Sequence, residues 1–288
     1  MEENIQNYII QKLLDSAAHI DTLARIERYR LWLDLLKEEK ADSLCRYGFR
    51  VYSQNDQDGM IQEICNRIGI TNRVFIEFGC DNGIENNTHY LLIQDWNGLW
   101  IDSNTQHIES IRKNFNSYIE NKKLTVINRK LSVDNLDSIL STYLKKYNNE
   151  CDVLVIDTDW NDYYFWESLT IQPRVVCIEY NGSIRPPTSV VVPYSEEYKW
   201  DGSSYFGASL TALCKLGKEK GYTCVGCSIA GTDTFFVRDD LLNNKFANDF
   251  VVKLDPIDAS IYYFQPARYN LEFNLGHTSN FGDWKIVD

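Results

Sequence analysis

The sequence has no cluster of basic residues that could follow a nucleic-acid backbone. Its 29 Lys and Arg residues are outnumbered by 41 Asp and Glu residues, which gives a formal net charge of −12 and a pI near 4.9. Binding phosphates along a duplex requires Lys and Arg gathered on one surface. We therefore expect a small-molecule or sugar partner and no nucleic acid.

Long apolar runs are also missing. No stretch approaches the roughly 18 to 20 apolar residues of a membrane span, and the N-terminal MEENIQNYIIQKLLD lacks the basic and apolar regions of a signal peptide. We expect a cytoplasmic protein without a membrane span. The eight cysteines are scattered, so reduced thiols are predicted. Cys224 and Cys227 have CxxC spacing but lie in a strand-like run, which indicates core packing.

At 288 residues the chain is long enough to bury a full α/β core. Three parts are predicted: an N-terminal helical extension over 1–49, a main domain over 50–254, and a C-terminal extension over 255–288. The N-terminal part has apolar residues on one helical face. It could cap the main domain, serve in homo-oligomerisation or form part of a substrate domain.

Apolar strand-like runs alternate with amphipathic helical segments through the main domain, which predicts a mostly parallel sheet covered on both faces. Two final runs joined by 230–233 predict an antiparallel hairpin. The segment 182–206 holds three of the six prolines and is predicted to be a lid or binding loop. The predicted strands are 73–78, 99–102, 124–128, 153–157, 175–180, 222–229 and 234–238; the predicted helices are 86–96, 106–121, 135–146, 163–169 and 208–220.

The stretch VFIEFGCDNG ends a predicted strand in an acid and then passes through two glycines. Gly79 and Gly83 would let the backbone approach a ligand where a Cβ would clash. Asp102 ends the next predicted strand, where a carboxylate can accept hydrogen bonds from ribose hydroxyls. The GxGxxG pattern of dinucleotide sites is missing, and Asp81 would repel a diphosphate. An acid-rich turn instead suits a cationic nucleoside such as S-adenosylmethionine.

Seven segments carry a family resemblance: YSQNDQDG (52–59), FIEFGCDNGIENNTHYLL (75–92), GLWID (98–102), DVLVIDTDWNDYYFW (152–166), RVVCIEYN (174–181), FGASLTAL (206–213) and GYTCVGCSIAGTDTFFVR (221–238). Together they resemble class I S-adenosylmethionine-dependent methyltransferases, and within these the FkbM-like group of sugar and polyketide O-methyltransferases. The resemblance implies a Rossmann-like, seven-stranded sheet, mostly parallel with an antiparallel C-terminal hairpin. Trp160 stands where a glycine is expected in the family's DIDGND-like loop. We therefore expect the substrate-facing wall of this protein to differ from that of the family.

The resemblance also implies a set of cofactor-binding residues. The methionine part would lie along the glycine turn and near the fourth predicted strand, the ribose against Asp102, and the adenine beside Ser103 and the Leu131-Ser132 pair. Gln54 and Asn87 are candidates for the cofactor carboxylate. The predicted cofactor residues are Gln54, Glu77, Gly79, Asp81, Gly83, Asn87, Asp102, Ser103, Ser132 and Asp157.

Acids at the ends of the fourth and fifth predicted strands form a second candidate site. Asp157, Asp159, Glu179 and Asn181 offer hard oxygen ligands of the kind that Mg²⁺ or Mn²⁺ prefers, and a divalent cation could lower the pKa of a sugar hydroxyl. In the metal-free alternative, Asp159 or Asp162 acts as the general base. His277 could also reach the site from the C-terminal extension. Tyr194, Trp200 and Tyr205 are candidates for stacking on a sugar.

We therefore predict an S-adenosylmethionine-dependent O-methyltransferase that acts on a hydroxyl of a sugar nucleotide or glycan precursor, as in the biosynthesis of surface polysaccharides or natural products. One alternative is a catalytically degenerate methyltransferase fold that binds the cofactor and scaffolds partners. An NAD-dependent oxidoreductase is disfavoured by the missing GxGxxG pattern.

Overall fold

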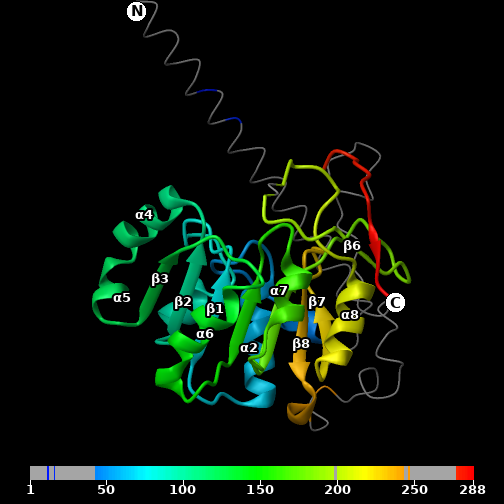
Figure 1. The fold of residues 1–288 in the computed structure, drawn as a ribbon. Helices are drawn as coiled ribbons and strands as arrows, with labels where there is room; N and C mark the ends of the chain where they lie inside the picture. Colours follow the sequence, from blue (N-terminus) through cyan, green and yellow to red (C-terminus); the bar gives the residue numbers. More distant parts are fainter. Residues whose placement is uncertain (1–11, 13–15, 17–42, 198–199, 243–245, 247–276) are drawn as a thin grey trace, which may run out of the picture.

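A seven-stranded sheet organises the part of the chain that the computed structural model describes, namely residues 12, 16, 43–197, 200–242, 246 and 277–288 (Figure 1). The strand order is β3-β2-β1-β4-β5-β8-β7, and every neighbouring pair is parallel except those that involve β8. This confirms the predicted Rossmann-like methyltransferase sheet with its antiparallel hairpin. The strands are β1 Val74–Phe78, β2 Asn97–Asp102, β3 Leu124–Asn128, β4 Val153–Ile156, β5 Val175–Glu179, β7 Tyr222–Cys227 and β8 Asp233–Arg238.

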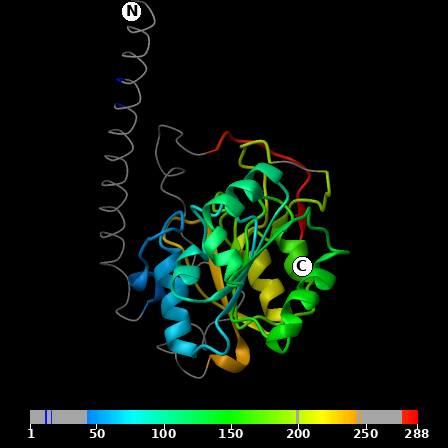
Figure 2. The ribbon, with the colours of Figure 1, turned by 90° about the vertical axis from the view of Figure 1, so that its left-hand side faces the viewer.

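Helices cover both faces of this sheet (Figure 2). Side chains alternate along a strand, so in β1 Phe75 packs with α2, α3 and α4, whereas Ile76 and Phe78 pack with α6, α7 and α8. The central strands β1 and β4 are buried along their whole length, as parallel strands between two helical layers should be. The helices are α2 Gln57–Ile68, α3 His89–Ile93, α4 Thr105–Asn114, α5 Asn116–Glu120, α6 Leu136–Leu144, α7 Asp162–Ser168 and α8 Leu210–Glu219, with short 3-10 helices η1 Leu44–Tyr47, η2 Lys145–Tyr147 and η3 Asp239–Leu241.

Two predicted helices differ from the structure. The segment 86–96 is helical only from His89, because Asn86 uses its Oδ1 atom to accept the backbone N–H of His89 at 2.8 Å and holds the preceding residues in turns. The segment 106–121 is divided into α4 and α5 at Phe115, whose buried ring meets Trp100 edge-on at 5.0 Å between centroids. Both differences lie where the chain folds around the glycine turn.

The long loop and the end of the chain each contribute a two-residue strand that the sequence did not predict. β6 (Val190–Val191) pairs antiparallel with β9 (Lys285–Ile286). The predicted helical extension before residue 43 and most of the predicted C-terminal extension lie outside the described residues, so the proposed division into three parts stays a prediction.

Two further features are the state of the cysteines and the length and polarity of the helices. All eight cysteines are described; they are buried, and none forms a disulfide, which agrees with the predicted reduced thiols. Within the described residues, every helix is too short or too polar to cross a bilayer.

Candidate active site

A pocket of about 570 Å³ opens beyond the carboxyl ends of β1, β2, β4 and β5, where open α/β sheets bind ligands. Its volume suits a small-molecule ligand. Most of the predicted site residues line it: Gln54, Glu77, Gly79, Asp81, Asn87, Asp102, Ser103, Asp157, Asp159, Glu179 and His277. The predicted residues that do not line this pocket are Gly83, Ser132, Asp162, Asn181 and two of the three stacking candidates, Tyr194 and Tyr205; the third, Trp200, does line it.

The glycine turn after β1 is shaped by its neighbours in the protein. A Cβ on Gly79 would fall on the main-chain oxygen of Asp157, so this glycine lets the ends of β1 and β4 approach each other. Gly83 is packed against the rings of Trp100 and Phe115 instead of facing the pocket. Gly79 lines the pocket and Gly83 does not, so a close approach of a ligand stays a prediction for Gly79 alone.

Glu77 is buried at the end of β1. Its carboxylate accepts the backbone N–H of Asn87 at 2.9 Å and the hydroxyl of Thr88, which in turn accepts from the indole N–H of Trp100 at 2.7 Å. Burial raises the pKa of Glu77 to about 7, because the loss of hydration outweighs the hydrogen bonds from Thr88 and Asn87. This acid holds the turn in place at the pocket wall.

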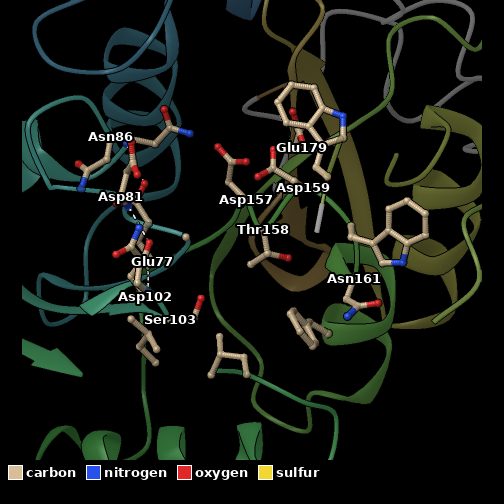
Figure 3. Close-up of a pocket in the computed structure, with 18 of the residues that line it drawn as sticks. Glu77, Asp81, Asn86, Asp102, Ser103, Asp157, Thr158, Asp159, Asn161 and Glu179 are labelled. Carbon is tan, nitrogen blue, oxygen red and sulfur yellow. Dashed lines mark hydrogen bonds between the residues drawn. The ribbon is translucent and has the colours of Figure 1, made fainter. Parts of the chain in front are cut away.

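Asp102 ends β2 and connects two loops on the same side of the pocket as Glu77 (Figure 3). Its Oδ2 atom accepts the backbone N–H of Asp81 at 3.0 Å and its Oδ1 atom accepts that of Asn104 at 2.7 Å. Each carboxylate oxygen can accept a second hydrogen bond. Asp102 can therefore bind hydroxyl groups of a ligand while it keeps both loops in position.

His107 of α4 is a pocket residue that the sequence did not predict. Its Nδ1 atom lies 2.8 Å from Oδ1 of Asp81 and 3.7 Å from Oδ1 of Asp102. It lies in the first turn of α4, the helix that follows β2, so its place at the start of that helix could have indicated it. The histidine joins α4 to the glycine turn and adds one polar group beside Asp102.

Three carboxylates gather on the other side of the pocket, facing Glu77, Asp81 and Asp102 (Figure 3). One oxygen each from Asp157, Asp159 and Glu179 lies within 4.8 Å of the others. Burial, followed by repulsion from neighbouring acids, raises the pKa of Asp157 and of Glu179 well above the ordinary values. Such a group of acids is arranged to hold a cation or a proton.

Two of the predicted catalytic or metal residues have internal partners. Asp162 is fully buried at the start of α7, where Oδ1 accepts both the backbone N–H and the hydroxyl of Thr158. Asn181 is also fully buried; its amide donates to the carbonyls of Ser204 and Phe206, and its Oδ1 accepts from Ser183. Both side chains shape loops around the pocket and lie outside its lining, so neither is positioned to act on a ligand.

Asp233 is the principal acid that the sequence did not predict. It starts β8 and pairs in register with Glu179, so it reaches the same edge of the sheet from an antiparallel strand. It accepts hydrogen bonds from Gln57 and from Asn87, which lies at 3.4 Å. Gln57 thereby ties α2 to the pocket. Parallel strands bring only their carboxyl ends to this edge of the sheet, whereas the antiparallel β8 brings its beginning.

Because burial raises the pKa of Glu77 from 4.5 to about 7, we expect the ligand-free protein to lose stability as the pH rises. The contribution of this group is complete below the unfolded pKa and is lost as the pH passes through about 7, at a cost of about 3 kcal/mol in the free energy of unfolding. Thermal melting in EDTA buffer should therefore show a lower Tm at pH 8.0 than at pH 5.5. Glu77→Gln should reduce this difference, and an equal difference in the variant would contradict the assignment.

Comparisons with known proteins concern the fold. No protein-family model matches this sequence, and no curated protein matches it either. Among solved structures, an O-methyltransferase family protein from Burkholderia thailandensis is 11% identical over 63% of this chain and 57% of its own, with a TM-score of 0.41. An S-adenosylmethionine-dependent methyltransferase from Clostridium acetobutylicum is 10% identical over 75% of this chain and 99% of its own, with a TM-score of 0.40. The glycopeptide N-methyltransferase MtfA in complex with sinefungin is 11% identical over 63% of this chain and 86% of its own, with a TM-score of 0.39.

Proposed function

We propose that this protein is an S-adenosylmethionine-dependent O-methyltransferase that acts on a sugar hydroxyl. The observation that carries the proposal is the pocket itself, in which Asp102 faces a second group of carboxylates across a space of about 570 Å³. A ligand between them needs hydroxyl donors at one end and positive charge toward the middle. S-adenosylmethionine has ribose hydroxyls, a sulfonium and an ammonium in that order.

The cofactor half comprises the glycine turn and the end of β2. Asp102 would accept the ribose hydroxyls, and Ser103 and Leu131 would flank the adenine. The carboxyl groups of the buried Glu77 and the half-buried Asp157 would attract the sulfonium and the ammonium, because the charged groups nearest to them are other acids. Gln54 would donate to the cofactor carboxylate.

The acceptor half is built on Asp157, Asp159 and Glu179. The residues fit a divalent cation, since Oε2 of Glu179 is buried without a hydrogen-bond partner and all three groups offer hard oxygen ligands. These three side chains would hold Mg²⁺ or Mn²⁺. When bound, the cation would supply Lewis acidity that lowers the pKa of the acceptor hydroxyl.

In the metal-free alternative, Asp159 would accept the proton of the acceptor hydroxyl. Loss of hydration, with Asp81 and Asp102 adding repulsion, raises the pKa of Asp159, which favours proton acceptance near neutral pH. The acceptor oxygen would then attack the methyl carbon in line with the sulfonium, so that the O–C bond forms as the C–S bond breaks and S-adenosylhomocysteine leaves. Holding both reactants in one enclosed site supplies much of the rate enhancement.

Release of S-adenosylhomocysteine in the presence of UDP-glucose, UDP-N-acetylglucosamine, GDP-mannose or dTDP-rhamnose tests the proposal. We expect turnover with at least one sugar, and a loss of at least about tenfold after EDTA treatment that Mg²⁺ or Mn²⁺ reverses. If EDTA does not change the turnover, the reaction does not require a divalent cation. Tight binding of S-adenosylhomocysteine without turnover on any hydroxyl acceptor would instead favour a cofactor-binding scaffold.

A further inference from the structure

The final described residues, 277–288, lie along the loop that borders the acceptor half of the pocket (Figure 1). At one end, the backbone N–H of Val287 donates to the carbonyl of Ser189 at 3.0 Å. At the other, the backbone N–H of Ser204 donates to the carbonyl of Thr278 at 2.9 Å. The segment is therefore fastened to the loop at both ends.

Aromatic contacts continue from this segment to the pocket. Trp284 meets Tyr205 edge-on at 4.8 Å between centroids, and Tyr205 meets Trp160 in the same way at 5.4 Å. His277 meets Trp200 at 4.7 Å. Trp160, Trp200 and His277 all line the pocket, so one wall of the acceptor half depends on the end of the chain.

Gly282 is the point where the segment fits most closely. A Cβ at this position would overlap the ring of Tyr205. Trp160 and Trp284 both lie against that ring. A single methyl group here should therefore either displace the segment or push the Tyr205 ring against Trp160.

We propose that residues 277–288 form the outer wall of the acceptor subsite and select the sugar ring that can bind. The segment would fix Trp160 through Tyr205 and would place His277 beside Trp200. Indole faces suit the apolar C–H face of a sugar ring, while the nearby carboxylates suit its hydroxyls. This inference rests on the proposed function for the identity of the ligand.

The test uses Gly282→Ala, a substitution at an exposed residue, with Phe281→Ala as the matched control. Phe281 is the adjacent residue, is 88% exposed and lies outside the pocket lining. We expect both variants to bind S-adenosylhomocysteine as the wild type does. Gly282→Ala should raise the KM for the best sugar nucleotide of the panel at least about fivefold, because a small misplacement of binding groups is costly.

Hydrogen–deuterium exchange gives a second readout that needs no acceptor. The amides of Val287 and Ser204, which bond to the carbonyls of Ser189 and Thr278, should exchange faster in Gly282→Ala than in Phe281→Ala. Equal acceptor KM values in the two variants would overturn the inference. If the wild type methylates no member of the panel, the proposed function fails. Hydrogen–deuterium exchange then decides the inference. Faster exchange in Gly282→Ala supports residues 277–288 as the wall of the pocket, and equal exchange in the two variants overturns it.

Discussion

Replacing Asp159 by asparagine is expected to lower kcat for methyl transfer by about 100- to 10,000-fold, the range found when a general base or a charged ligand is lost. Asparagine keeps the shape of the side chain but cannot accept the proton and is a weaker cation ligand. The backbone at Asp159 has φ of 66°, and asparagine tolerates this left-handed conformation as well as aspartate does. The loss should therefore be chemical. Steady-state kinetics with the acceptor identified in the sugar panel would measure it.

Asp95→Asn is the matched control for this substitution. Asp95 also has a positive φ, of 69°, but its exposed carboxylate pairs with Lys123 and lies outside the pocket lining. We expect wild-type kinetics from it. If Asp159→Asn kept more than about a tenth of kcat, the role would pass to another group, with His277 the next candidate. A need for more Mg²⁺ in the variant would assign Asp159 to cation binding, and unchanged Mg²⁺ dependence would assign it to proton transfer.

The fold could be predicted from the sequence because its strands are apolar runs long enough to show a pattern. Each of the seven predicted strands is present, with ends that shift by a few residues. β6 and β9 were not predicted, since two residues are too few to show a periodicity. Their pairing depends on contacts between residues about 95 positions apart, which local sequence does not record.

The acids of the pocket were predictable for a related reason. Parallel strands bring their carboxyl ends to one edge, so Glu77, Asp102, Asp157 and Glu179 had to lie near one another. Asp233 was not predicted, because it stands at the beginning of β8, which runs antiparallel to the other strands that reach the pocket. Asn181 was predicted as a ligand from its position alone; its burial against the long loop could not be read from the sequence. The chemical roles of the pocket residues stay predictions.

Removing the carboxylate of Asp102 is expected to weaken binding of S-adenosylhomocysteine roughly 10- to 100-fold, which corresponds to about 1.5–3 kcal/mol for hydrogen bonds to a charged group. Asp102→Ala also deprives the backbone N–H groups of Asp81 and Asn104 of their acceptor. Asp102→Asn retains a carbonyl oxygen as an acceptor and should lose less affinity. Isothermal titration calorimetry measures Kd for the three proteins, and circular dichroism checks that each variant is folded.

A ligand lacking one ribose hydroxyl separates direct contact from loop disorder. If Asp102 binds the ribose, 2′-deoxy-S-adenosylhomocysteine should bind the wild type about tenfold more weakly than the parent compound, whereas Asp102→Ala should bind both about equally. Disorder of the Asp81 and Asn104 loops would weaken both ligands by the same factor and leave their ratio unchanged. An unchanged ratio in Asp102→Ala would therefore show that Asp102 acts through the loops, and the ribose would have to lie elsewhere in the pocket.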